Sequence, residues 1–175
     1  MSNTSNMIYA DVLKAFDEEG VRYLIVGGFA VNLYGYVRLT VDLDIMVDLE
    51  AGNLMNLVKI MERVNYTPRV PVKSIDLIDE KTRDTWVKEK GAVVFTFIDL
   101  KDPVKHIDIF LKNPVDFERA YHARKVLTLK GIQINVASIE DLIALKQLSG
   151  RPRDIEDIAH LKKVLEIRKR MTNGT

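Results

Sequence analysis

The chain has 175 residues, 47% of them hydrophobic, which is enough for one domain that buries a sizeable core. Its 26 basic and 25 acidic residues leave a formal net charge of +1, so binding of nucleic acid would need a local basic patch. The absence of cysteine excludes disulfides and metal sites built from thiolates.

The sequence also indicates where the protein works. No apolar run reaches the roughly 20 residues that a membrane-spanning helix needs. The first residues, MSNTSNM, lack the charged and apolar regions of a secretory signal peptide. We therefore expect a cytoplasmic protein that has no membrane partner.

The N-terminal segment, residues 7–19, has the pattern of an amphipathic helix that ends at Gly20. Its apolar residues recur at helical spacing: Ile8, Val12, Leu13 and Phe16. We expect this helix to cover a β-sheet and assign it no functional role.

A glycine pair follows the first predicted strand. Residues 23–26 form a short apolar run that stops at Gly27-Gly28, which is typical of a buried strand. Residues 29–34 then predict a short helix that ends at Gly35. Glycine at the start of a helix lets backbone N–H groups approach an anion, so this turn is a candidate phosphate site.

Two carboxylates mark the second predicted strand, residues 41–47. Side chains alternate along a strand, so Asp42 and Asp44 should share one face. Neighbouring carboxylates repel each other unless a cation lies between them, and Mg²⁺ prefers such oxygen ligands. A solvated acidic strand edge would give the same pattern, but the glycine pair shortly before it favours a metal site.

The middle of the chain is less informative. Residues 54–64 predict a second amphipathic helix, and two prolines make residues 66–72 a loop or an edge strand. Residues 74–86 fit either a helix or a strand. This region is locally basic through Lys81, Arg83, Lys88 and Lys90. We favour a solvated face there over the rim of a substrate cleft.

A third carboxylate lies within an apolar strand. Residues 92–98 and 106–111 predict two strands that run antiparallel, and isoleucines flank Asp108 in the second. A charge in such a strand is costly unless it has a partner, although Asp108 could also face solvent at a sheet edge. His106 should share the face of Asp108 and could contact phosphate or a carboxylate, but we assign it no chemistry.

The C-terminal part combines a helix at residues 115–124, a hairpin and two further helices. Residues 126–136 predict the hairpin, with its turn at Lys130-Gly131. Ser138 opens a capping-box pattern before a helix at residues 142–148, and the last helix begins near Pro152 and ends at about residue 170. We expect a single domain over residues 1–175, with a helical portion at about 137–170 and disorder at 171–175.

Four charged residues lie where these last two helices meet: Lys146, Arg151, Asp154 and Asp157. Lys146 belongs to a largely apolar helix, so its ammonium should reach into a cleft, where it could hold a phosphate. Arg151 could add a planar fork to a phosphate. Asp154 and Asp157 could orient these cations or contact a second substrate, and a purely structural salt bridge is an equal alternative for Asp157.

Together these motifs resemble the nucleotidyltransferase superfamily, which has the fold of DNA polymerase beta. The Arg-x-Thr-x-Asp-x-Asp pattern that ends at Asp44 and the Lys…Arg-x-x-Asp-x-x-Asp pattern that ends at Asp157 are most similar to minimal AbiEii-type enzymes. The similarity covers about residues 21–165. Many members have Gly-Ser where this chain has Gly27-Gly28, so backbone amides would have to replace a serine contact to phosphate.

The resemblance implies an α+β (mixed α/β) fold, in which helices flank a mixed central sheet. It also implies Mg²⁺ or Mn²⁺ as cofactor and transfer of an NMP from an NTP to an acceptor hydroxyl, with release of pyrophosphate. The implied catalytic and metal-binding residues are Asp42, Asp44 and Asp108. The implied nucleotide-binding residues are Gly27, Gly28, Arg38, Thr40, Lys146, Arg151 and Asp154.

The sequence leaves the partners open. The acceptor could be a tRNA, a protein or a small molecule, and the protein could act with a partner protein or as a homodimer. One alternative is a nucleotide-binding or toxin–antitoxin-like partner module that has the same fold without turnover. Another is an interaction protein whose acidic strands carry no chemistry.

Overall fold

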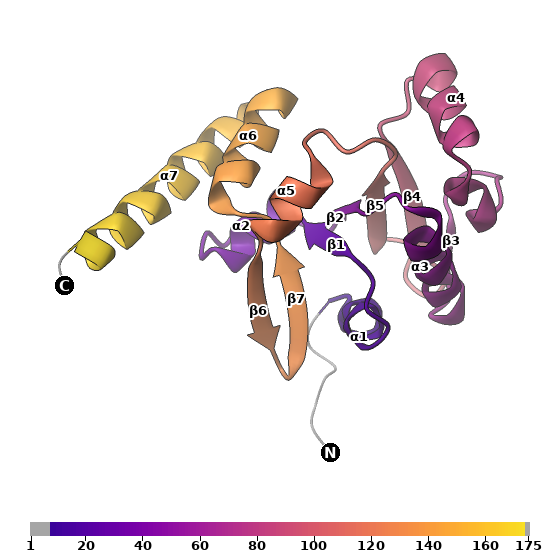
Figure 1. Cartoon of the computed structure of the whole chain (residues 1–175), viewed down its shortest axis with the longest axis horizontal. Helices are drawn as coiled ribbons and strands as arrows, with labels where there is room; N and C mark the ends of the chain where they lie inside the picture. The colour runs from indigo at the N-terminus through magenta and orange to yellow at the C-terminus, as the bar shows by residue number, and fades with distance from the viewer. Residues whose placement is uncertain (1–7, 174–175) are drawn as a thin grey trace.

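A mixed sheet of seven strands forms the centre of the computed structural model, which describes residues 8–173 (Figure 1). The strands are β1 (Tyr23–Ile25), β2 (Leu43–Val47), β3 (Tyr66–Pro68), β4 (Val94–Asp99), β5 (His106–Phe110), β6 (Lys125–Leu129) and β7 (Ile132–Val136). Their order across the sheet is β3-β4-β5-β2-β1-β7-β6.

Strand directions make this a mixed sheet. β2 runs parallel to β5, and β1 runs parallel to β7. All the other neighbouring strands are antiparallel, including β4 and β5, as the sequence predicts. The expected mixed α/β architecture is thereby confirmed.

Seven α-helices and one short 3₁₀ helix complete the described part of the chain. They are α1 (Ala10–Glu18), α2 (Gly27–Leu33), α3 (Ala51–Arg63), the 3₁₀ helix η2 (Ser74–Ile78), α4 (Glu80–Lys90), α5 (Phe117–His122), α6 (Ile139–Ser149) and α7 (Pro152–Asn173). None of them is both long and apolar enough to cross a membrane.

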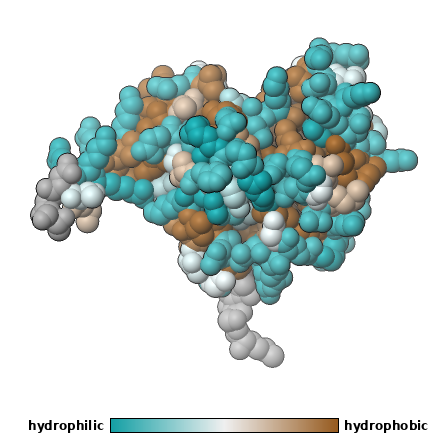
Figure 2. Space-filling model, viewed as in Figure 1, coloured by the Kyte–Doolittle hydropathy of each residue, from teal (hydrophilic) through white to brown (hydrophobic). Residues whose placement is uncertain are grey.

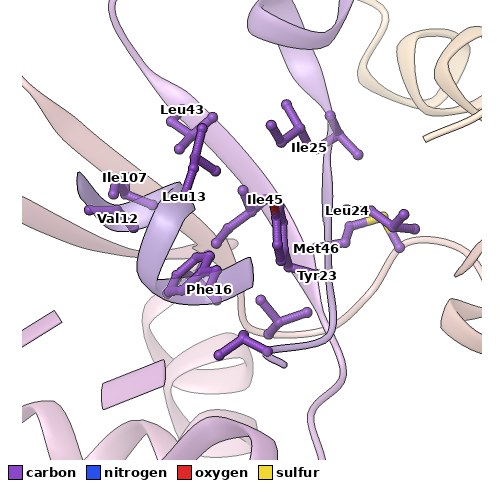
Figure 3. Packing of buried hydrophobic residues seen from close by; sticks show 14 of the residues in the cluster. Val12, Leu13, Phe16, Tyr23, Leu24, Ile25, Leu43, Ile45, Met46 and Ile107 are labelled. Atoms are coloured by element: carbon purple, nitrogen blue, oxygen red, sulfur yellow. The ribbon is translucent and has the colours of Figure 1, made fainter. Parts of the chain in front are cut away.

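Helix α1 covers one face of the sheet. Its residues Val12, Leu13 and Phe16 are fully buried, and Figure 3 shows them against β1 and β2. The ring of Phe16 packs 5.1 Å from the ring of Tyr23, measured between centroids. Burying a side chain of this size stabilises a fold by about 1.5–3 kcal/mol, so α1 is a substantial part of the core.

The opposite face of the central strands is also covered. In Figure 3, Leu24 and Met46 lie on the side of the strands away from α1, and both are fully buried. Helix α2 packs against β2 and α6 packs against α2. Both faces of β2 are therefore largely covered, and Asp44 is the one residue of this strand that keeps partial exposure.

The ambiguous middle segment forms η2 followed by α4. Asp79 caps α4 by accepting a hydrogen bond from the Thr82 N–H at 2.8 Å, and α4 ends at Gly91 in the left-handed region. The proline-containing segment contributes the edge strand β3, which pairs only with β4 among the described strands. An edge position suits a strand that contains proline, because one of its sides needs no N–H donors.

The C-terminal helices follow the capping signals. Ser138 caps α6 by accepting a hydrogen bond from the Asp141 N–H at 3.1 Å, and Gly150 ends α6 with φ of 61°. Helix α7 continues to Asn173, past the expected end near residue 170, so residues 171–173 are helical rather than disordered. Residues 174–175, where disorder was also expected, lie outside the described residues.

The face of the molecule that Figure 2 shows is mainly polar. Figure 2 shows hydrophilic residues over most of the face in view, with hydrophobic residues scattered among them. Figure 1 shows that α7 extends away from the sheet at one end of the molecule, while α4 lies at the other end.

Candidate active site

Three polar side chains form a row across β4, β5 and β2. Asp108 pairs in register with Asp44 on the parallel strand β2 and with Thr96 on the antiparallel strand β4. Residues in register project to the same face of a sheet, so the row lies on the face opposite to Ile45 and α1. The Thr96 hydroxyl donates a 2.6 Å hydrogen bond to Asp108 Oδ1, which orients that carboxylate.

A carboxylate and an imidazole form a pair at the ends of the same strands. Asp42 immediately precedes β2, and His106 is the first residue of β5. Their Oδ1 and Nε2 atoms are 2.9 Å apart. Asp42, His106 and Asp108 each offer a ligand atom, and these three atoms lie within 4.8 Å of one another. Within residues 8–173, Asp44 is not part of such a group.

Tyr9 joins the two strands that carry these side chains. It is the N-cap of α1, and its hydroxyl contacts the Val41 carbonyl and the His106 carbonyl, the latter at 2.9 Å. The same oxygen accepts a hydrogen bond from the His106 N–H at 3.2 Å. Burial raises the pKa of this phenol well above its ordinary value, so the hydroxyl remains a donor. No local pattern in the sequence indicates this contact, because Tyr9 and His106 are 97 residues apart.

Asp44 has the most perturbed carboxyl of the row. Burial raises its pKa from 3.8 to about 6, and the negative charges of Asp108 and Asp42 add to the effect. The positive charges of Arg151 and Lys146 act in the opposite direction but do not cancel it. Among the described residues, the positive charges near Asp44 therefore do not fully balance the negative charges around it.

The glycine pair makes room for side chains of the site. Gly27 has φ of 64°, and a Cβ atom at this position would overlap Asp44 Oδ2. A Cβ atom at Gly28 would lie 2.5 Å from Arg38 Nη2 and 3.0 Å from Thr40 Oγ1. Sequence reasoning assigned the pair to phosphate binding alone. The packing shows a second reason, because any side chain here would displace Asp44 or Arg38.

A buried ion network connects the loop after α2 with α6 and α7. Arg38 faces Asp157 through two nitrogen–oxygen pairs, each 3.1 Å apart. Lys146 lies between Asp157 at 2.6 Å and Asp154 at 3.2 Å. Asp157 is 1% exposed and Lys146 is 6% exposed. Of the two alternatives for Asp157, the observed contacts are those of a salt bridge that also orients the two cations.

Asp154 also caps α7. Its Oδ2 accepts a hydrogen bond from the Arg151 N–H at 2.9 Å. Burial alone would raise the pKa of this carboxyl, but the hydrogen bonds from Arg151, Ser149 and Lys146 lower it overall. Asp154 is thus ionised and already paired, with its oxygens directed to the helix start and to Lys146.

Arg151 differs from the other cations of this region. Its side chain is exposed and forms no ion pair with any residue between 8 and 173. Its charge nevertheless acts on Asp44. Among the three predicted phosphate-binding cations, Arg151 is therefore the one that remains available without breaking a buried ion pair.

The basic middle region divides into structural and exposed residues. Arg83 is buried and donates 2.8 Å hydrogen bonds to the carbonyls of Leu77 and Ile78, which closes η2 against α4. Lys88 forms an exposed pair with Asp84 on the same helix. Arg83 thus belongs to the scaffold and is not a surface cation.

The donor set fits a divalent cation. Asp42 and Asp108 offer carboxylate oxygens. The pKa of Asp44 is raised by burial and, in addition, by the charges of these two carboxylates, and a cation would relieve that repulsion. Hard divalent ions take such oxygen ligands and complete their shell with water or phosphate oxygens.

The sequence matches the family model described as "Nucleotidyltransferase of unknown function (DUF6036)" over residues 7–169. No curated protein matches the sequence. Similar solved structures include the lincosamide antibiotic adenylyltransferase LnuA bound to lincomycin, at 19% identity and a TM-score of 0.56, covering 87% of this chain and 93% of that chain.

Two further solved structures have the same fold. ANT(2")-Ia in complex with adenylyl-2"-tobramycin has 15% identity and a TM-score of 0.58, covering 91% of this chain and 88% of that chain. An antigenic nucleotidyltransferase-like protein from Paracoccidioides brasiliensis has 17% identity and a TM-score of 0.55, covering 86% and 71%. At these identities the likeness extends to the fold, while the family match covers nearly the whole chain. The chain belongs to the DUF6036 family of nucleotidyltransferases.

Proposed function

We propose that this protein is a divalent-metal-dependent enzyme that transfers an NMP from an NTP to an acceptor hydroxyl and releases pyrophosphate. The observation that carries the proposal is the alignment of Asp44 with Asp108 on neighbouring parallel strands, with Asp42 one residue before β2. Three carboxylates in one place oppose folding unless they serve a cation. The raised pKa of Asp44 has burial as its main cause, and the charges of Asp108 and Asp42 add to it.

Each carboxylate has its own role in this proposal. Asp42 and Asp108 would hold the cation, with Asp44 beside them as the third oxygen donor. A divalent cation bound there would neutralise the triphosphate and favour the deprotonated form of the attacking hydroxyl. Asp108 is also the best candidate to accept the proton of that hydroxyl, because Thr96 fixes the orientation of its carboxylate.

The donor nucleotide would lie between the carboxylate row and the start of α7. Arg151 supports this placement, because it is exposed, free of ion pairs within the described residues and electrostatically coupled to Asp44. Arg38 and Lys146 would contribute positive charge near the phosphates without direct contact, since both form ion pairs with Asp157. Thr40 lies against Gly28, at the glycine turn where a phosphate would approach the backbone.

A small hydroxylated molecule is the first acceptor class to test. One structure of the same fold is described as a lincosamide antibiotic adenylyltransferase bound to lincomycin, and another is a complex with adenylyl-2"-tobramycin. Their coverage figures show that this chain and those proteins share most of their lengths. A tRNA end or a protein hydroxyl remains an acceptor class for the same chemistry.

One observation favours a nucleotide-binding module without turnover as the second candidate. Lys146 and Arg38, which the family resemblance assigns to the nucleotide, are already neutralised by Asp154 and Asp157. A protein of this kind would bind nucleotide or a toxin–antitoxin-like partner and transfer nothing.

Transfer of label from each α-³²P NTP tests the proposal. Separate reactions would contain Mg²⁺ or Mn²⁺ and one acceptor class: total RNA, total protein, or a panel of aminoglycosides and lincosamides. We expect label to move to one class, and an Asp42→Asn variant to lose at least 10²-fold of the rate because a positioned charge is removed.

The control variant is Asp84→Asn, which removes an exposed carboxylate of α4 outside the proposed site. It should retain the wild-type rate. Nucleotide binding without transfer in any reaction would favour the binding module. Transfer that persists in Asp42→Asn and in Asp44→Asn would contradict the assigned carboxylate roles.

A further inference from the structure

His106 is the one histidine among the described residues whose ring nitrogen lies beside the carboxylate row. Its Nδ1 is 3.1 Å from the carbonyl oxygen of Val104. A carbonyl oxygen can only accept a hydrogen bond, so Nδ1 carries the proton of the neutral ring. The lone pair of Nε2 therefore points away from Val104 and toward Asp42.

The Nε2 atom of His106 faces a carboxylate oxygen of Asp42. Asp42 Oδ1 lies 2.9 Å from Nε2, and both atoms carry lone pairs when the ring is neutral. This separation is stable only with a positive centre between the two atoms, which is a proton if the ring is an imidazolium and a metal ion if Nε2 keeps its lone pair. Cis ligands of an octahedral ion with bonds of about 2.1 Å are separated by a similar distance, about 3 Å.

The backbone contact of His106 is also the one that metal-binding histidines use. A ligating imidazole usually donates its other N–H to a carbonyl or carboxylate, which fixes the ring orientation and the tautomer. Val104 supplies that carbonyl from the turn before β5, and Tyr9 holds the His106 backbone in place. The ring and the backbone of His106 are thus each held by a hydrogen bond, so the side chain is oriented without a bound ion.

We infer that His106 is a direct metal ligand together with Asp42 and Asp108, and that this nitrogen makes the site select Mn²⁺ over Mg²⁺. The inference rests on the metal role proposed above for the two carboxylates. Mg²⁺ prefers oxygen ligands only, whereas an imidazole shifts preference toward transition-metal ions. The choice between the two expected cofactors is therefore made by a residue to which the sequence alone assigned no chemistry.

Manganese itself is a spectroscopic probe of this arrangement. EDTA-treated full-length protein would be titrated with Mn²⁺ and, separately, with Mg²⁺, and pulsed EPR of the Mn²⁺ complex would report ¹⁴N hyperfine coupling from a bound imidazole. We expect nitrogen coupling in the wild type and a Mn²⁺ affinity at least about tenfold higher than the Mg²⁺ affinity.

Two matched variants separate a ligand from a structural residue. His106→Gln keeps a polar side chain that can hydrogen-bond Asp42 but has no ring nitrogen, so nitrogen coupling should vanish and Mn²⁺ affinity should fall about tenfold or more. Mg²⁺ affinity should change by less than about threefold, because its oxygen ligands remain. His122→Gln is the control: its Nδ1 also faces a carbonyl, that of Glu118 at 2.7 Å, but it belongs to no ligand group among the described residues.

The outcomes distinguish this inference from the proposed function. Mn²⁺ bound to the wild type without nitrogen coupling, no Mn²⁺ binding, or unchanged Mn²⁺ binding in His106→Gln would each overturn the inference. NMP transfer by an enzyme that lacks nitrogen coupling would leave the proposed function intact. Nitrogen coupling in a protein that transfers no NMP would support the inference and count against the function.

Discussion

Asp44 is the residue whose charge opposes folding most clearly. Its pKa is raised from 3.8 to about 6 by burial and by the neighbouring carboxylates. Between these two pH values the unfolded chain releases the proton while the folded protein keeps it. The stability of the metal-free protein should therefore fall as pH rises through this window, and remain lower above it.

The variant Asp44→Asn tests this cost. Without metal at pH 7, it should raise the free energy of unfolding by up to about 3 kcal/mol, the equivalent of a shift of about two pKa units. The gain should shrink as pH falls through this window and vanish below about pH 3, where the carboxyl is protonated in both states. Urea unfolding in EDTA at several pH values measures it. Asp84→Asn should change stability by less than about 0.5 kcal/mol, and a loss of stability in Asp44→Asn at pH 7 would contradict the argument.

Gly27 can be tested with an internal reference. Gly27→Ala places a methyl group where Asp44 Oδ2 lies and also forces alanine to a φ of 64°. Gly20→Ala imposes nearly the same φ, 66°, but its Cβ atom meets nothing within 4 Å. Both variants should lose about 1 kcal/mol or more of stability through backbone strain.

Only Gly27→Ala should lose NMP transfer, because only this variant displaces a carboxylate of the site. Thermal unfolding and the transfer assay, run on both variants, separate strain from displacement. Equal activity in the two variants would show that Asp44 needs no support from the glycine turn.

At the scale of elements, Asp157 joins three of them. It binds Arg38 from the loop after α2 and Lys146 from α6, while it belongs to α7 itself. Asp157 and Lys146 are buried and Arg38 is half-buried, so each charge depends on its partners to offset the loss of hydration. The network therefore holds the C-terminal helices against the part of the chain that carries Arg38 and the carboxylate strands.

Asp157→Asn should lower the free energy of unfolding by about 3–5 kcal/mol, because it leaves the buried Lys146 and the half-buried Arg38 with one carboxylate. Urea denaturation measures this loss. Glu18→Gln is the matched control, since Glu18 pairs with Lys14 on α1 with both side chains more than half exposed. This control should lose less than about 0.5 kcal/mol, and equal effects in the two variants would mean that the network is not a stabilising connection.

At the scale of the whole molecule, the site is assembled from distant segments. Tyr9, the β2 and β5 strand ends and the α6–α7 junction all contribute, so the unfolded chain has no preformed site. Ligands that bind only the folded state should therefore stabilise the entire protein. Metal plus NTP at about 100 times the dissociation constant should add about 2.7 kcal/mol.

Thermal unfolding with Mn²⁺ alone, NTP alone and both together measures this linkage. We expect the combination to shift the melting temperature more than either ligand alone. In Asp42→Asn the shift by Mn²⁺ should be largely lost. A shift that is the same in the wild type and in this variant would place metal binding elsewhere.

The parts that sequence reasoning predicted well are those set by local periodicity. Alternation along a strand places Asp44 and Asp108 opposite to the apolar face, and glycine or capping residues mark most helix ends. The missing parts depend on packing between remote segments. The pair of Arg38 with Asp157 spans 119 residues, and neither partner carries a local signal for the other. The fit of Gly27 to Asp44 likewise exists only once α2 and β2 are packed together.

The strand register that aligns Asp44 with Asp108 has a consequence for errors in folding. Side chains alternate with a period of two, so a slip of one residue in β5 would turn Asp108 toward α1 and bring Ile107 or Ile109 to the site. Such a molecule would bury a charge in its core and expose isoleucines at the same time. A chain with this register error would lack the aligned carboxylates and would also be less stable than the native fold. Its unfolded population would be larger, so proteases would remove it faster than correctly folded molecules.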